Sequence, residues 1–332
     1  MEIRHDSASI GKHHETLYFP AGDLVLAASL KNPGHADGSV LFRVHKFMLA
    51  HHSPIFNDMF ALPPVDTIET YDGANLVHMP DSAEDLEGLL RVLRCLPYNR
   101  RDFDESYFLC GVLELAIKYE IDSIRDRIVG QLKAEWPADL EAWDQLEDRR
   151  QAIWKAGDSD AAAELLPEPV LSIQLARQCD ARDVLLGAFY QLSWLSAWDI
   201  WDCASPDDDA TFNPKARWNL LDSRDLLRII RAREVLSFRT KADPVKMHFL
   251  GKRCSESESC NRTFRLIWED MSSEICRTRD PLEALRILQR PSSPYTSMLC
   301  LSCCIHEKTF LRNMRKKMWD NLLSTIISIP IS

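Results

Sequence analysis

The residues with the clearest potential for chemistry are cysteines near the carboxyl end of the chain. Cys254 and Cys260 form one pair with five residues between them, and Cys300 and Cys303 form a second pair as C-x2-C. Four thiolates in two pairs can enclose a tetrahedral Zn²⁺, and the C-x2-C spacing is common in structural zinc sites. The pattern predicts a structural zinc site with no position open for catalysis. Redox chemistry and ordinary thiols are the alternatives.

Histidines offer a second kind of chemistry, but their positions favour structural roles. A catalytic base at His45 would need a nucleophile or an oriented carboxylate within hydrogen-bond reach. We expect instead a buried ring where a strand meets a helix, with Asp23 nearby as its partner. The adjacent His51 and His52 diverge by about 100° on a helix, so they are poorly placed to chelate one ion.

Composition and motifs argue against an enzyme and against a general nucleic-acid binder. The sequence has no Gly-rich phosphate loop, G-x-S-x-G or H-E-x-x-H, and only 11 glycines in 332 residues. Its net charge is -10, which disfavours broad contact with nucleic acid. The basic cluster of Arg312, Arg315, Lys316 and Lys317 is interpreted as a solvated helix face. We therefore expect neither a catalytic residue nor a small-molecule substrate.

The stretch from Val40 to Phe60 organises the front of the chain. It begins with the alternation typical of a strand and changes at His45 to the three- and four-residue spacing of helices. Ser53 is a good N-cap and Pro54 suits a first helical turn. The pattern predicts a strand followed by two short helices.

This stretch, V-L-F-x-V-H-K-x-x-L-x-x-x-S-P-x-F-x-x-M-F, resembles the signature of BTB/POZ domains in the version common among fungal proteins. The resemblance continues to about Trp136. It implies a small sheet flanked by about five helices and a role in protein binding. The matching positions are Asp23, Phe42, Val44, His45, Lys46, Leu49, Ser53, Phe56 and Phe60.

The composition changes where the resemblance ends, because every tryptophan lies at or beyond Trp136. We predict a disordered tail at 1–15, an α+β BTB/POZ-like domain at 16–137, and a mostly α-helical region from 138 to 332. The helical region divides at 251 into a first part, 138–251, and a cysteine-bearing part, 252–332. The first 15 residues contain no apolar core, so we do not expect them to be a signal peptide, and no apolar run reaches membrane-spanning length. We therefore expect an intracellular protein, cytoplasmic or nuclear, without a membrane partner.

These observations predict a non-enzymatic interaction protein, a scaffold or adaptor that binds itself or another protein. Candidate surface residues are Phe47, Met48, Phe56 and Met59, although some of them must belong to the core. The resemblance leaves a narrower alternative open, a substrate adaptor of a cullin-type ubiquitin ligase. A zinc-containing transcriptional regulator is the second alternative.

Overall fold

The computed structural model describes residues 11–31, 38–63, 69–94, 106–158, 161, 165, 167–198, 200, 215–240, 254–278, 280–290 and 294–327. The chain divides into two compact units, which we call the N-terminal unit (1–132 with 174–180) and the C-terminal unit (133–173 with 181–332). The expected boundary at residue 137 lies close to the first division. The return of residues 174–180 to the N-terminal unit was not predicted, since nothing in their composition marks it.

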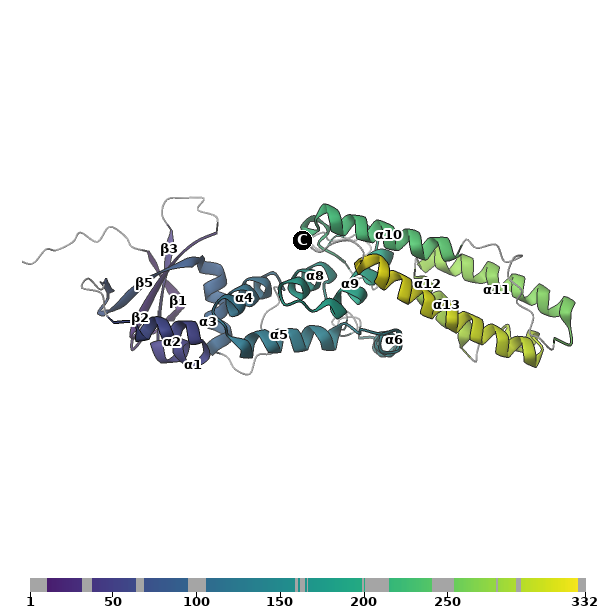
Figure 1. Ribbon diagram of the computed structural model, residues 1–332, viewed down its shortest axis with the longest axis horizontal. Coiled ribbons are helices and arrows are strands. Elements are labelled where there is room, and N and C mark those ends of the chain that lie inside the picture. The colour runs from purple at the N-terminus through teal and green to yellow at the C-terminus, as the bar shows by residue number, and fades with distance from the viewer. Residues whose placement is uncertain are drawn as a thin grey trace, which may run out of the picture. The chain divides into compact units, whose positions relative to one another are not determined.

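The N-terminal unit is built on a five-stranded sheet (Figure 1). Its strands follow the order β1-β3-β2-β5-β4, in which β1 runs parallel to β3, β2 antiparallel to β3 and parallel to β5, and β4 antiparallel to β5. The strands are β1 (Lys12–Tyr18), β2 (Leu24–Ser29), β3 (Ser39–Val44), β4 (Thr70–Tyr71) and β5 (Ala74–Ser82).

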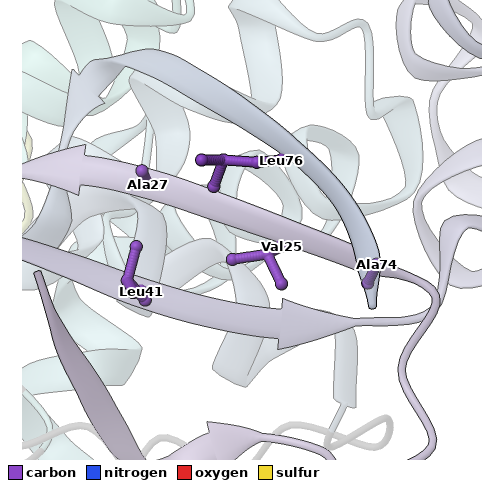
Figure 2. Close-up of a cluster of buried hydrophobic side chains, with 5 residues drawn as sticks. All are labelled: Val25, Ala27, Leu41, Ala74 and Leu76. Atoms are coloured by element: carbon purple, nitrogen blue, oxygen red, sulfur yellow. The ribbon is translucent and has the colours of Figure 1, made fainter. Parts of the chain in front are cut away.

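The sheet curls until side chains of its two edge strands meet. His13 of β1 hydrogen-bonds Tyr71 of β4 (3.1 Å), and the Tyr18 hydroxyl donates to Asp72 (3.1 Å) in the turn between β4 and β5. The curled sheet has a buried apolar cluster from three neighbouring strands: Val25, Ala27, Leu41, Ala74 and Leu76 (Figure 2). Burial of these side chains removes apolar surface from water, and this hydrophobic effect is the main contribution that favours folding.

The predicted strand and helical pair are confirmed. β3 leads into α1 (Lys46–His52), and Ser53 alone separates α1 from α2 (Pro54–Ala61). Asp23 accepts a hydrogen bond from the Lys46 backbone N–H (2.7 Å), so a carboxylate directly before β2 satisfies a free donor at the start of α1. The expectation of a buried His45 is wrong, because its ring is exposed and Asp23 bonds the backbone beside it.

Helices complete the N-terminal unit: α3 (Ala83–Arg94), α4 (Ser106–Lys118), α5 (Asp122–Glu135), and the end of α8 (Pro169–Gln178). The Ser82 hydroxyl accepts from the Asp85 backbone N–H (3.1 Å) and donates to the Asp85 carboxylate (2.7 Å), which caps α3. Gly111 permits close packing of α4 on α3, because a Cβ there would lie 1.9 Å from an Asp85 oxygen.

The C-terminal unit is helical (Figure 1). Trp143, Tyr190 and Trp319 meet in one aromatic cluster, with ring centroids 5.4 to 6.0 Å apart. Besides the rest of α8, its elements are α6 (Leu140–Lys155), α9 (Arg182–Trp194), η2 (Trp218–Leu220), α10 (Ser223–Thr240), α11 (Ser257–Thr278), α12 (Pro281–Gln289), η4 (Thr296–Met298) and α13 (Leu301–Ile327). The prediction of an α+β domain followed by a mostly helical region is thereby confirmed.

Three expectations about local structure are corrected. Residues 12–15 belong to β1 rather than to a disordered tail, and Lys12 and His13 pair with β3; residues 1–10 lie outside the described part of the chain. The Pro-Pro and Asp-Gly content of residues 63–75 predicts a loop, but Thr70–Tyr71 form β4. Arg315 is buried, not solvated, because it forms a two-bond pair with Asp144 of α6 (2.9 and 2.5 Å). Arg312, Lys316 and Lys317 are exposed as predicted.

Candidate functional site

The first candidate site is the surface of α1 and α2. Phe47 of α1 is 78% exposed, Ile55 of α2 is 40% exposed, and Leu62, directly after α2, is 69% exposed. We call these three residues the α1–α2 apolar residues. Exposed phenyl and branched aliphatic side chains are the groups that gain most when a partner removes them from water. The pair of helices can therefore supply apolar anchors to a binding partner.

Only part of the predicted surface set is accessible. Phe47 is exposed as expected, whereas Met48 and Met59 are half-buried. Phe56 is fully buried, stacked on Tyr119 with ring centroids 4.4 Å apart, and so is a core residue. Ile55 is exposed but was not predicted as a surface residue, because helical spacing alone does not show which side of α2 faces the core.

The orientation of the two helices is fixed at Ser53. Its buried hydroxyl accepts from the Phe56 backbone N–H (3.1 Å), capping α2, and donates to the Tyr119 carbonyl (2.6 Å) after α4. The Tyr119 hydroxyl in turn donates to Asp81, and burial raises the pKa of Tyr119, with the Asp81 carboxylate adding to the effect. This chain of bonds joins the α1–α2 pair to the body of the N-terminal unit.

The remaining signature positions are structural. Phe42, Val44 and Leu49 are fully buried. Lys46 and Phe60 are half-buried, and the Lys46 ammonium lies 6.0 Å from the centroid of the Phe60 ring. The signature therefore describes the packing of the strand and two helices, and most of its residues are not available to a partner.

The second candidate site joins the four predicted cysteines. The Sγ atoms of Cys254, Cys260, Cys300 and Cys303 all lie within 4.8 Å of one another, and we call this group the four-cysteine cluster. Cys260 and Cys303 are buried, while Cys254 and Cys300 are half-buried. Cys304 and His306 follow in the sequence but do not belong to the cluster.

The starts of two helices position these thiols. Cys254 precedes α11 and Cys260 lies in its first turn, whereas Cys300 precedes α13 and Cys303 lies in its first turn. Thr263 of α11 bonds to the Met298 carbonyl (3.4 Å), which ties η4 and the following Cys300 to α11. The site is thus assembled from segments distant in sequence.

The surroundings of the four-cysteine cluster favour the deprotonated, thiolate form of Cys300. Backbone N–H groups of Cys303 and Ser255 bond to the Cys300 sulfur and lower its pKa to about 6. Burial has the opposite effect at Cys260 and raises the pKa of that thiol. Helix amino termini carry partial positive charge, so the starts of α11 and α13 both support negative charge on sulfur. The chemistry that this arrangement can perform is to bind a cation that prefers sulfur.

A membrane-crossing segment is absent from the described residues, since none of their helices is both long and apolar enough. Neither the curated proteins nor the solved structures include a match to this chain. The BTB/POZ domain family matches residues 35–135. That range contains β3, the α1–α2 pair and the helices that support it, while β1 and β2 precede it. Residues 35–135 are therefore a BTB/POZ domain, a protein–protein interaction module.

Proposed function

We propose that this protein is a non-enzymatic scaffold or adaptor whose BTB/POZ domain binds a second copy of the chain or another protein through α1 and α2. The observation that carries the proposal is the exposure of the α1–α2 apolar residues on a domain of an interaction family. The fungal version of the domain, indicated by the motif alone, stays a prediction.

The physical basis is the burial of apolar anchors within a polar rim. Phe47 projects from α1 and stacks against His51 at a centroid distance of 5.6 Å. Truncation of an aromatic residue that is a hot spot of an interface typically costs about 2 kcal/mol or more of binding free energy. The neighbouring Asn57 and Asp58 are exposed polar residues of α2 and could form part of the rim.

The test uses the full-length chain in two variants. Phe47→Asp and Leu62→Asp should each abolish or strongly weaken self-association in light scattering, or remove partners recovered by affinity purification and identified by mass spectrometry. Trp154→Asp is the matched control, since Trp154 is an exposed aromatic of the C-terminal unit. Unchanged association and unchanged partners in both BTB variants would refute the proposal.

The wild-type chain and the Phe47→Asp variant also test the alternative of a cullin adaptor. Retention of a cullin amino-terminal domain by the wild-type chain, with loss in the Phe47→Asp variant, would select the adaptor role. Self-association without cullin binding would select the scaffold role. The net charge of -10 disfavours DNA binding, and therefore the role of a transcriptional regulator.

The four-cysteine cluster has a supporting role in this proposal. Four protein thiolates complete a tetrahedral coordination sphere and leave no position for a substrate or an activated water. A metal ion held there would stabilise the C-terminal unit and would not take part in catalysis.

A further inference from the structure

The four-cysteine cluster lies where the first turns of α11 and α13 approach each other. We propose that Cys254, Cys260, Cys300 and Cys303 bind one Zn²⁺ ion, which fastens the amino-terminal end of α11 to that of α13. This goes beyond the proposed binding role of the BTB/POZ domain, because it lies in the other unit and does not depend on α1 or α2.

The sulfur positions suit a tetrahedral ion. With Zn–S bonds of about 2.3 Å, the sulfurs of a regular tetrahedron lie about 3.8 Å apart. The Sγ atoms of Cys254 and Cys300 are 4.0 Å apart, and the largest separation in the cluster is no more than 4.8 Å. Contraction by less than about 1 Å would give zinc its full coordination. A disulfide requires about 2.05 Å, so the 4.0 Å pair is not one.

Hydrogen bonds to sulfur supply an independent observation. The Cys300 backbone N–H points to the Cys260 Sγ at 3.5 Å, linking the two halves of the cluster. A ZnS₄ group carries two excess negative charges, and N–H donors around its sulfurs offset that charge and hold the ligands in place. Donors directed at thiols that are partly buried are what such a centre requires.

The donor set selects the metal. Thiolate sulfur is a soft ligand, and a tetrahedral S₄ site suits zinc or an iron–sulfur cluster, whereas Mg²⁺ and Ca²⁺ require oxygen. The sulfurs lie within 4.8 Å of one another. That spacing suits a single ion, because four thiolates that surround a multi-iron cluster must stand farther apart.

The ion would close a long loop. Residues 261–299, including α12, lie between the two cysteine pairs. Their apolar side chains Leu282, Leu285 and Leu288 are buried, and α12 packs against both α11 and α13. A cross-link that closes a loop of this length lowers the entropy of the unfolded chain more than a short one does. Zinc would therefore raise the stability of the α11–α12–α13 assembly.

The experiment measures metal in the full-length chain purified under reducing conditions. We expect roughly one zinc and negligible iron per chain by elemental analysis. Replacement with Co²⁺ should give the visible spectrum of a tetrahedral tetrathiolate site. Cys254→Ser and Cys300→Ser should each lower zinc content at least about tenfold after dialysis against a weak chelator. These two half-buried positions disturb packing least.

Cys304→Ser is the matched control, since Cys304 neighbours Cys303 but lies outside the cluster, and it should retain full zinc content. Removal of zinc with a strong chelator should lower the thermal midpoint of the wild-type chain and leave that of Cys300→Ser unchanged. If the variants do not fold, the cobalt spectrum of the wild-type chain still reports the number of thiolate ligands. Zinc-free wild-type protein that takes up neither Zn²⁺ nor Co²⁺ would overturn the proposal, as would bound iron.

Discussion

The two units differ in how they treat buried polar groups. Among the described residues, Ser53 is the one fully buried polar residue of the N-terminal unit, and its bonds go to the backbone. The C-terminal unit buries charged side chains, including Glu147, Arg228, Arg286 and Arg315. An apolar core tolerates small losses gradually, whereas a buried charge becomes costly once its partner is removed. The stability of the N-terminal unit therefore depends mainly on apolar packing, whereas the stability of the C-terminal unit also depends on the pairing of buried charges.

The largest expected effect tests that dependence on pairing. Arg315→Ala should destabilise the C-terminal unit by about 4 kcal/mol, because it leaves the carboxylate of Asp144 without its bidentate partner. The Leu282 carbonyl also loses the Arg315 Nε donor (3.0 Å). Denaturant unfolding followed by tryptophan fluorescence measures this directly, since every tryptophan lies at or beyond Trp136.

Arg312→Ala is the control for that experiment, because Arg312 is an exposed residue one turn earlier on α13. It should change the free energy of unfolding by no more than about 0.5 kcal/mol. Equal effects of the two substitutions would show that the C-terminal unit does not depend on the buried pair.

The second prediction concerns the apolar core of the N-terminal unit. Phe56→Ala should cost about 3 kcal/mol, through lost transfer free energy and the cavity left against Tyr119. Far-UV circular dichroism of the full-length chain during denaturant unfolding measures it. Phe47→Ala on the exposed face should cost about 0.5 kcal/mol or less. A reversed order would mean that Phe47 of α1, and not Phe56 of α2, contributes to the core.

A smaller effect is expected at Ser53, the buried polar residue between α1 and α2. Ser53→Ala removes the cap of α2 and leaves the Tyr119 carbonyl without the donor that Ser53 supplies. The substitution should lower the free energy of unfolding by about 2 kcal/mol. Ser53→Thr keeps the hydroxyl and should recover most of that stability. Asn57→Ala, at an exposed position of α2, serves as the control in the same unfolding assay. If Ser53→Ala matched Asn57→Ala, the hydroxyl would not anchor the helix pair.

Elements that are determined by a clear local pattern could be predicted from the sequence, whereas elements without such a pattern could not. The strand and helix pair at Val40–Phe60 were predictable because local periodicity and the Ser53-Pro54 boundary determine them. The β4–β5 hairpin was missed despite its Asp72-Gly73 turn, which has positive φ at both residues. That dipeptide is a strong hairpin signal, but β4 has only two residues and no pattern of its own.

Contacts between distant segments were harder to predict. The C-x2-C spacing of Cys300 and Cys303 correctly suggested that the four cysteines gather, because ligand spacing leaves a local trace. The burial of Arg315 leaves no such pattern in the local sequence, since its partner Asp144 lies on a different helix far away in the sequence. Charged residues are mostly exposed, so the basic cluster of α13 was assigned to solvent as a whole.

The smallest expected effect concerns a buried carboxyl that forms no salt bridge within the part of the chain that the structure describes. Glu307 lies one helical turn after Cys303 on α13, is 6% exposed, and burial raises its pKa to about 7. The folded state holds this proton more tightly than the unfolded state does. Stability is therefore lost as pH rises from about 4.5 toward 7, and the penalty is constant above that range. A shift of that size corresponds to at most about 3 kcal/mol, and relaxation and water penetration around the carboxylate reduce it. Glu307→Gln should therefore stabilise the unit by about 1 kcal/mol at pH 8 and by nothing measurable at pH 4.

Tryptophan-detected unfolding of wild type and Glu307→Gln at a series of pH values tests this sign. Because both proteins contain the same cysteines, titration of the thiols cancels in the difference between them. Glu258→Gln is the matched control, since that side chain is 93% exposed on α11, and its difference from wild type should be near zero at every pH. A stabilisation by Glu307→Gln that stayed constant from pH 4 to pH 8 would come from packing. It would mean that ionisation of the Glu307 carboxyl does not lower the stability of the C-terminal unit.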